Sequence, residues 1–261
     1  MRVLFIGDVV GGPGRRGLAA AMPELRERCN PDLVIVNGEN SAGGVGITEK
    51  TAASLFDAGM DVITTGNHVY RHREVYDYLD RTDRVIRPAN YPLANPGRGH
   101  TVVEVAGRRV GVINLSGAVG LQVARLPFPE VDSILERIEA DCVVVDFHAE
   151  VTSEKVAMGW HLDGRVAAVF GTHTHVPTAD GRVLPKGTAF ISDVGMTGSR
   201  ASVLGVKPEQ ALTALAKQMP IRFETAEEDI WVMGAVVEIN ERGLADSFEQ
   251  ILMPAPSGAR S

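Results

Sequence analysis

The chain has 261 residues, of which 44% are hydrophobic and 23% charged, as is typical of one globular α/β domain with a sizeable core. Its formal net charge of −7 argues against a broad nucleic-acid surface, although a small phosphoester can still bind where a metal neutralises its charge. The two cysteines lie outside any C-x-x-C pattern, and the first residues lack the features of a signal peptide. No apolar run approaches the roughly 20 residues that a membrane span needs. These features predict a cytoplasmic protein that does not enter a membrane.

The first half of the chain alternates predicted strands with predicted helices. Apolar, β-branched runs predict strands near residues 2–7, 32–37 and 61–65. Start and stop signals predict helices over about 13–28, 48–58 and 71–81. This alternation is typical of a mostly parallel sheet with helices on its faces.

The second half combines a long loop with further helices and strands. Residues 83–100 are rich in Pro, Asn and Gly and are expected to form a loop. After it we expect a hairpin of 101–105 and 109–114, helices near 129–139, 153–161 and from Pro208, strands near 142–147 and 166–170, and strand pieces within 178–193. Antiparallel strands are expected at about 222–224, 231–240 and 247–253. We therefore interpret residues 1–253 as a single α/β domain of two sheets packed face to face with helices outside, followed by a disordered tail, 254–261.

Polar residues stand at the carboxyl ends of five predicted strands. They are Gly7-Asp8, Gly38-Glu39-Asn40, Gly66-Asn67-His68, Asp146-Phe147-His148 and Gly171-Thr172-His173-Thr174-His175. In open α/β sheets, ligands bind at this edge of the sheet. Carboxylates, amides and imidazoles that meet there predict a metal site, and their number favours a site for two metal ions.

Each of these residues also has a structural explanation. His173 and His175 are two apart, so an extended segment points both at one ligand, but the pair is also compatible with two surface histidines in a loop. His148 taken alone is more typical of a hydrogen-bonded structural histidine. The two imidazoles at the end of the next strand make a metal-ligand role the favoured one. Asp8 can cap a helix. Glu39 follows a strand too apolar to be exposed on either face, so its carboxylate needs a cation or hydrogen bonds.

For the two side-chain amides and for His68, the sequence again allows a role at the metal site or a structural role. Asn40 and Asn67 are neutral oxygen ligands for hard or borderline divalent ions, and both are also common turn residues. His68 directly follows Asn67, and adjacent side chains on a turn diverge, so we predict that His68 is a general acid beside the site. The histidines without strand-end context, which are expected at the surface, are His72, His100 and His161.

Taken together, the motifs resemble the calcineurin-like metallophosphoesterase superfamily. Its pattern is D-x-H, G-D, G-N-H-[DE], a lone His and G-H-x-H, each after a strand. The segments that match are Gly66-Asn67-His68, His148 and His173-Thr174-His175, and the positions that depart from it are Val10, Glu39 and Val69. The same departures occur in one branch of the superfamily that this sequence resembles, the bacterial YmdB-like phosphodiesterases. The opening Met1–Gly11 and the stretch Asn37–Gly44 also resemble that branch, and the resemblance extends from residue 1 to about 253.

The resemblance implies a four-layer αββα sandwich with a dinuclear centre, in which iron is favoured and manganese, zinc or magnesium are alternatives. It implies that one metal is held by Asp8, Glu39, Asn40 and His175, with Glu39 bridging, and the other by Asn67, His148 and His173. It also implies phosphodiesterase activity on small phosphodiesters, including 2′,3′-cyclic nucleotides. A metal-bridging hydroxide would attack the phosphorus, and His68 would protonate the leaving oxygen.

Other functions remain open from the sequence. A metal-containing regulatory or binding protein with little turnover would tolerate loss of His68, whereas an enzyme would not. Phosphomonoesterase or nuclease activity is compatible with the same centre, although the acidic composition disfavours long nucleic acids. The segment Gly12–Gly17 matches the G-x-G-x-x-G motif of NAD-binding folds. It begins five residues after Gly7, too late for a tight turn directly off the strand, and NAD binding would leave the imidazoles without a role.

Substrate specificity is expected to depend on loops near the strand ends. The loops in question are Ser41–Ile47, Tyr91–Gly99 and Gly117–Pro129. The last contains apolar residues that would suit a lid or a contact between copies of the chain, so a homo-oligomer remains open; they are Leu121, Val123, Leu126 and Phe128.

Overall fold

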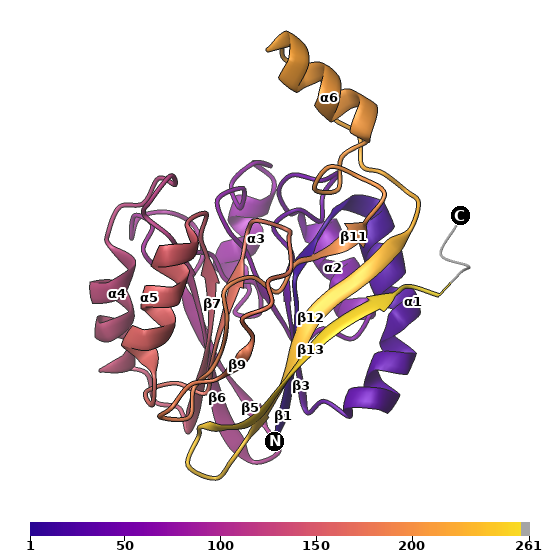
Figure 1. Cartoon of the computed structure of the whole chain (residues 1–261). Coiled ribbons are helices and arrows are strands. Elements are labelled where there is room, and N and C mark those ends of the chain that lie inside the picture. Colours follow the sequence, from indigo (N-terminus) through magenta and orange to yellow (C-terminus); the bar gives the residue numbers. More distant parts are fainter. Residues whose placement is uncertain (257–261) are drawn as a thin grey trace.

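Successive side chains of the first strand pack into different layers of the protein. In β1 (Arg2–Ile6), Val3 and Phe5 join one apolar cluster, whereas Leu4 and Ile6 join another. This is the period-two alternation of a strand that is buried on both faces. The computed structural model, which describes residues 1–256, accordingly places β1 in a sheet that is covered on both sides (Figure 1).

The first sheet has a parallel centre and an antiparallel edge. β1 pairs in parallel with β3, which pairs in parallel with β4, while β12 is antiparallel to both β1 and β13. The strand order is β2-β11-β12-β1-β3-β4, with β13 against β12. The bounds of these strands are β2 (Asp8–Val9), β3 (Leu33–Asn37), β4 (Val62–Thr64), β11 (Met196–Ser199), β12 (Ile230–Ile239) and β13 (Ala245–Pro254).

The second sheet has the order β5-β6-β7-β8-β10-β9. β6, β7, β8 and β10 are parallel, and the edge strands β5 and β9 are antiparallel to their neighbours. The bounds are β5 (His100–Val105), β6 (Arg108–Ser116), β7 (Cys142–His148), β8 (Ala168–Thr172), β9 (Arg182–Val183) and β10 (Ala189–Ile191).

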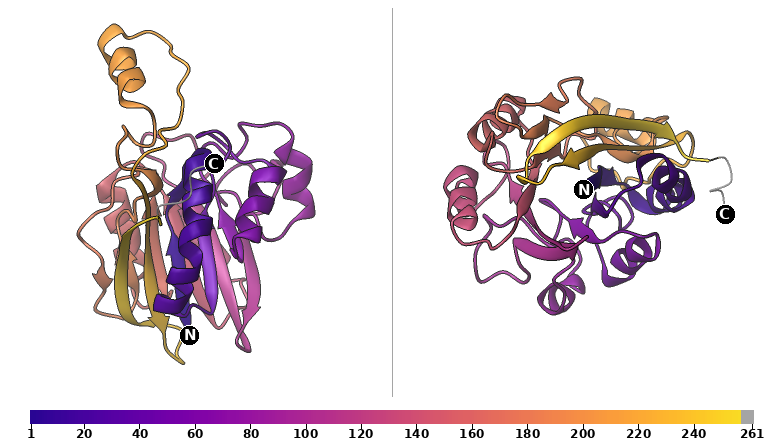
Figure 2. Two further views of the ribbon diagram at one scale, coloured as in Figure 1. Left: turned by 90° about the vertical axis from the view of Figure 1, so that its right-hand side faces the viewer. Right: turned by 90° about the horizontal axis from the view of Figure 1, so that it is seen from below.

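Helices cover the outer face of each sheet, so the protein has four layers (Figures 1 and 2). The first sheet carries α1, α2 and α3, the second carries α4 and α5, and α6 projects away from the layers. The bounds are α1 (Gly11–Cys29), α2 (Glu49–Asp57), α3 (Val75–Arg81), α4 (Pro127–Leu135), α5 (Thr152–Leu162) and α6 (Pro208–Lys217). Among residues 1–256, no helix is long and apolar enough to cross a membrane.

Three apolar clusters of the described residues fill the spaces between these layers. Leu18 of α1 packs with Leu4 beneath the helices of the first sheet. Between the sheets, the rings of Phe5 and Phe170 stack with centroids 4.6 Å apart. Met158 of α5 belongs to the cluster between the second sheet and its helices. The predicted αββα arrangement of two mixed sheets with helices outside is therefore confirmed.

Several predicted boundaries were wrong. Residues 71–74 form turns, and the helix begins only at Val75. Residues 222–224 are exposed and do not form a strand. Glu224 accepts one backbone hydrogen bond from Lys207, and the next residue, Thr225, makes only an isolated bridge to Val206. β2 and β11 were not predicted. Pro254, expected in the tail, ends β13 opposite Trp231; the rest of the expected tail from residue 257 lies outside the described residues.

The glycines of segment 12–17 have a packing role within α1. The helix begins at Gly11, so the segment lies inside its first turns and not in a loop. A Cβ on Gly14 would collide with the backbone oxygen of Thr197 in β11, and a Cβ on Gly17 would collide with Ile230 of β12. The two glycines therefore allow α1 to lie close against the sheet, which accounts for them without a dinucleotide.

Candidate metal centre

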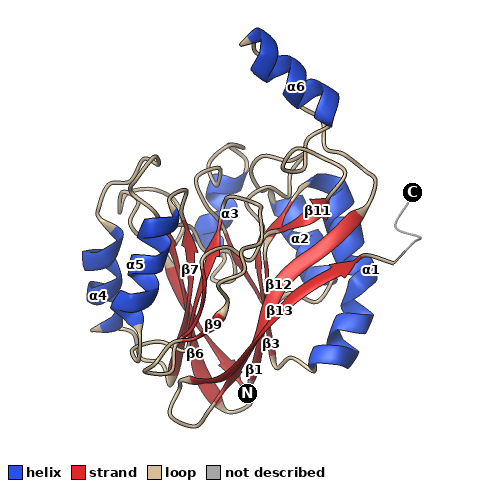
Figure 3. Ribbon diagram, viewed as in Figure 1, coloured by secondary structure: helices blue, strands red, loops and turns tan. Residues whose placement is uncertain are grey.

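Ligand-type atoms from both sheets meet around one nitrogen of His148. Its Nε2 lies 2.9 Å from Asn67 Oδ1, 3.0 Å from His173 Nδ1 and 3.1 Å from Glu39 Oε1. Glu39 and Asn67 follow strands of the first sheet, whereas His148 and His173 stand at the ends of β7 and β8 in the second. The carboxyl ends of these strands face the upper side of the view in Figure 3, below the loops and α6.

A second group of atoms gathers around His175 and shares Glu39 Oε1 with the first group. His175 Nε2 is 3.0 Å from Asn40 Nδ2 and 3.8 Å from Asp8 Oδ1, and Asn40 Nδ2 donates to Glu39 Oε1 at 3.2 Å. Glu39 thus belongs to both groups. The structure brings together all seven residues that the sequence suggested as metal ligands.

Burial makes this acidic cluster costly without a cation. Asp8 and His148 are fully buried and Glu39 is 1% exposed. Among the described residues, Asp8 Oδ1 has no hydrogen-bond partner. A buried carboxylate oxygen without a partner is strongly unfavourable unless a cation or donor faces it. The donor set of carboxylate, imidazole and amide groups fits divalent or trivalent metal ions.

The three imidazoles are oriented by acceptors on their outer nitrogens. The backbone oxygen of Leu204 accepts from His175 Nδ1 at 3.0 Å, and the carboxylate of Glu150 faces His173 Nε2 at 2.9 Å. Thr172 Oγ1 lies 2.9 Å from His148 Nδ1. Each ring therefore directs its other nitrogen at the cluster. This is the arrangement by which outer hydrogen bonds fix metal-binding histidines.

Asp146 and Thr172 connect His148 to the first sheet. The Thr172 hydroxyl donates to Asp146 Oδ1 at 2.7 Å, so its oxygen is left to accept from His148 Nδ1. Asp146 Oδ2 accepts from Asn37 Nδ2 at 2.9 Å, and Asn37 Oδ1 accepts from the backbone of Glu39. One buried carboxylate therefore orients residues in both sheets. Burial raises the pKa of Asp146 to about 6, although His148 and three hydrogen bonds oppose that rise.

Replacing Thr172 by valine should weaken metal binding about 10- to 100-fold, the usual effect of losing an outer hydrogen bond to a ligand. Valine keeps the shape but removes the acceptor for His148 Nδ1. Metal affinity measured by chelator competition tests this, and Thr172→Ser, which keeps the hydroxyl, is the matched control. Equal affinity in the valine variant and the native protein would contradict the role.

Close backbone approach explains two of the glycines before the polar residues. A Cβ on Gly66 would collide with His148 Nε2 and Glu39 Oε2. A Cβ on Gly171 would collide with the backbone oxygen of Ser192 in the loop after β10. Gly66 is thus required where the cluster residues converge, and Gly171 where β8 lies close to the chain that follows β10.

The loop that carries His173 and His175 has a strained backbone. Both have positive φ, 98° and 65°, a region that non-glycine residues rarely adopt. Asp8 Oδ2 accepts from the backbone of His173, and Asp193 Oδ2 accepts from both the backbone and the hydroxyl of Thr174. Since this geometry is held by several bonds, the two imidazoles are positioned before any ligand binds.

Lys155 and Asp193 were not identified from the sequence. Lys155 Nζ lies 2.7 Å from Asp193 Oδ2, and both side chains are almost completely buried. Their partnership joins α5 to a loop 38 residues later, so no local pattern marks it. The detectable signal was a lysine on the buried face of a helix, which requires a partner.

Charges within the cluster shift the pKa values of its members in different directions. Burial alone would raise the pKa of Glu39, yet His148 and His68 hold it well below the usual range. Burial would lower the pKa of His148, but Glu39 and Asp8 raise it to about 9. Burial and the charge of His148 lower the pKa of His173 to about 3. At neutral pH a single proton on His148 Nε2 therefore stands where three acceptors converge, a position that suits a cation.

His68 lies at the margin of the cluster. Its side chain is 38% exposed, its Nδ1 donates to Asn40 Oδ1 at 3.1 Å, and its backbone N–H donates to Glu39 Oε2 at 3.1 Å. Asn40 turns its oxygen toward His68 and its nitrogen toward His175. A ligand role for Asn40 would need the amide to rotate by about 180°, whereas the present orientation makes it a support for His68.

Known proteins are similar to this chain over almost its whole length. A family model described as YmdB-like protein matches residues 4–251. The 2′,3′-cyclic-nucleotide 2′-phosphodiesterase of Bacillus subtilis (strain 168) is 45% identical over 256 residues, which cover 97% of each chain. A crystal structure of a hypothetical protein from Thermus thermophilus has a TM-score of 0.93 at 41% identity and covers 98% of this chain and 100% of its own. A novel phosphatase from Mycoplasma pneumoniae has a TM-score of 0.92 at 33% identity, with 97% and 93% covered.

Proposed function

This chain belongs to the YmdB-like family, and we propose that it is a metal-dependent phosphodiesterase that hydrolyses small phosphodiesters, with 2′,3′-cyclic nucleotides as its substrate class. The observation that carries the proposal is the set of three imidazoles, each fixed by an outer acceptor and directed at buried carboxylates. The activity named for the B. subtilis relative supports the substrate class.

We propose two metal positions that share Glu39. One would use Asp8, Glu39 and His175, and the other Glu39, Asn67, His148 and His173. Asn40, expected from the sequence as a ligand of the first metal, would instead support His68 through its amide oxygen. We base this division on the two groups of short distances, both of which include Glu39 Oε1. The mixed nitrogen and oxygen donors are compatible with iron, manganese, zinc or magnesium, and we place iron first only because the family resemblance favours it.

Two ions held there would supply a water nucleophile of lowered pKa and would offset the charge of the phosphoryl oxygens. The residues of the chain do the rest. Asn40 Oδ1 accepts from the N–H at His68 Nδ1, so as a general acid His68 would act in its imidazolium form, with the transferable second proton on Nε2. When the water oxygen bonds to phosphorus and the P–O2′ bond breaks, His68 Nε2 would protonate the departing oxygen. Because the ring is 38% exposed, it can regain a proton from solvent.

Product analysis tests this proposal. Protein purified with added iron or manganese should convert 2′,3′-cyclic AMP to the 3′-monophosphate, as followed by phosphorus NMR, and dialysis against a chelator should stop the reaction. Bound metal without hydrolysis of any cyclic nucleotide would instead support a binding or regulatory protein. Absence of bound metal would contradict the proposal as a whole.

Phosphomonoester hydrolysis is a second candidate, because the M. pneumoniae relative is described as a phosphatase. The same two-metal site would act on a terminal phosphate. Comparison of kcat/KM for 2′,3′-cyclic AMP and 3′-AMP separates the two: a ratio well above one supports the diesterase, and the reverse supports the monoesterase.

Metal affinity should rise with pH up to about pH 9. The raised pKa of His148, about 9, means that its Nε2 carries a proton at neutral pH which a metal ion must displace. That proton is lost only as the pH rises through about 9, so the affinity should increase about tenfold per pH unit below this value and then level off. Competition between Mn²⁺ binding and a chelator at controlled pH measures the slope. A flat profile over the two pH units below that pKa would contradict the protonated state.

A further inference from the structure

A cavity of about 580 Å³ opens beside the metal centre at Asn67. This volume is in the range of small-molecule sites. Two of the loops expected to set specificity meet around it, Tyr91–Gly99 and Gly117–Pro129. Asn67 belongs to both the cavity and the centre, since its Oδ1 lies 2.9 Å from His148 Nε2. A phosphoryl group at the centre would therefore place its organic substituent at the mouth of this cavity.

The aromatic wall of the cavity is held in place before a ligand binds. The rings of Tyr70 and Tyr91 have centroids 6.2 Å apart, and Tyr76 packs edge-on against Tyr70 at 5.5 Å. The Tyr70 hydroxyl donates to the backbone oxygen of Pro96 at 2.8 Å, and Tyr91 is only 8% exposed. A planar group that stacks on this wall would cost little side-chain entropy.

The other lining residues favour a neutral heteroaromatic ring. Asn95 and Gln122 supply amides that both donate and accept hydrogen bonds, as the edge of a nucleobase requires. Among the described residues that line the cavity, none is charged. A second phosphate would find no counter-charge there, whereas a base would find a stacking surface and polar partners.

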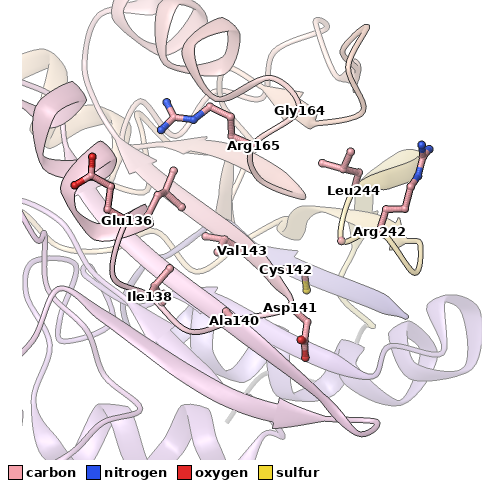
Figure 4. Close-up of a pocket in the computed structure, with 12 residues that line it drawn as sticks. Glu136, Ile138, Ala140, Asp141, Cys142, Val143, Gly164, Arg165, Arg242 and Leu244 are labelled. Carbon is pink, nitrogen blue, oxygen red and sulfur yellow. The ribbon is translucent and has the colours of Figure 1, made fainter.

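Two other cavities fit a base less well. The cavity of about 410 Å³ in Figure 4 contains Cys142 at the amino end of β7, the opposite end of that strand from His148, and is lined by charged residues such as Arg165 and Arg242. A cavity of about 340 Å³ beside His175 contains Trp231, but the guanidinium of Arg200 already covers that ring at 4.2 Å.

We propose that the cavity between Tyr70, Asn95 and Gln122 is the subsite for the nucleobase of the substrate. Tyr70 provides the stacking surface, and the two amides contact the edge of the base. This inference rests on the proposed phosphodiesterase function, and its test must separate the two.

The test compares 2′,3′-cyclic AMP with a base-free substrate, the 2,3-cyclic phosphate of 1-O-methylribose. Tyr70→Leu should raise KM for cyclic AMP about 10- to 100-fold, the usual effect of losing a base–aromatic stack, and Gln122→Ala should raise it about 3- to 10-fold. The kcat/KM for the base-free substrate should change far less, so the preference for the base-bearing substrate should collapse. Gln122 is exposed, so its replacement does not threaten the fold.

Arg242→Ala, in the cavity of Figure 4, is the control and should leave both substrates unaffected. If the native protein hydrolyses both substrates and neither variant alters their ratio, the subsite is wrong while the phosphodiesterase function stands. If Trp231→Leu alone removes the preference, the base lies in the cavity beside His175 and the assignment is overturned. If the native protein hydrolyses neither substrate, the proposed function fails first, and the subsite with it.

Discussion

Replacement of Glu39 by glutamine should lower the metal content well below two ions per chain and reduce hydrolysis about 10³-fold or more. Glutamine keeps the shape of the side chain but removes the charge that both groups of ligand atoms share. It would also place an amide donor or a neutral oxygen 3.1 Å from His148 Nε2, where a carboxylate now stands. Two-metal sites stabilise their transition states by several kcal/mol, so a loss of this size follows if the shared ligand fails.

Elemental analysis after purification with added metal, paired with hydrolysis of bis-p-nitrophenyl phosphate, measures both effects. Glu104→Gln is a matched control, because Glu104 is an exposed carboxylate on β5, at the edge of the second sheet. The control should keep both metal and activity. Two metals and full activity in the Glu39 variant would remove Glu39 from the centre.

The pattern of polar residues at strand ends predicted much of the candidate site, because a buried strand and the polar residue that ends it can both be recognised from neighbouring residues in the sequence. An apolar run such as Val143–Val145 reports a buried strand, and the polar residue that ends it must lie at the edge of the sheet. The pairing of β6, β7 and β8 in parallel then brings those edges together without further information. Sequence alone could therefore place His148 and His173 near each other.

Other parts of the site depend on partners that no local pattern specifies. β2 is two residues long and forms only because Asp8 and Val9 pair with Met196 and Thr197, far along the chain. The link from Asp146 to Asn37 crosses from one sheet to the other. The orientation of the Asn40 amide follows from its neighbours His68 and His175 in space. Contacts of this kind could not be predicted from the sequence, because they depend on how whole layers pack and not on the periodicity of one segment.

The helix predicted over residues 71–81 illustrates a further limit. The polar pattern that predicted the helix includes residues 71–74, which form turns instead. In these turns the backbone N–H of Arg71 donates to His68 O, and that of Val75 donates to His72 O. These turns place Asn67 at the centre and Tyr70 in the adjoining cavity. Helix propensity is a weak prior, and here the geometry of the site takes precedence over it.

Replacement of His68 by alanine should leave the metal content near that of the native protein and reduce turnover of 2′,3′-cyclic AMP about 10²- to 10⁴-fold, the range for a lost general acid. The metal should stay because the contact from residue 68 to Glu39 Oε2 is made by the backbone N–H, which alanine keeps. Hydrolysis of bis-p-nitrophenyl phosphate should fall much less, since p-nitrophenolate leaves readily without a proton.

The contrast between the two substrates distinguishes a proton donor from a structural residue. A structural defect would lower both activities together, whereas loss of the acid affects the substrate with the poor leaving group. His100→Ala, at an exposed histidine that begins β5, should change neither activity. Full turnover of cyclic AMP in the His68 variant would remove the acid role. Loss of metal would show that its imidazole acts through Glu39, whose carboxylate lies 3.4 Å from His68 Nδ1.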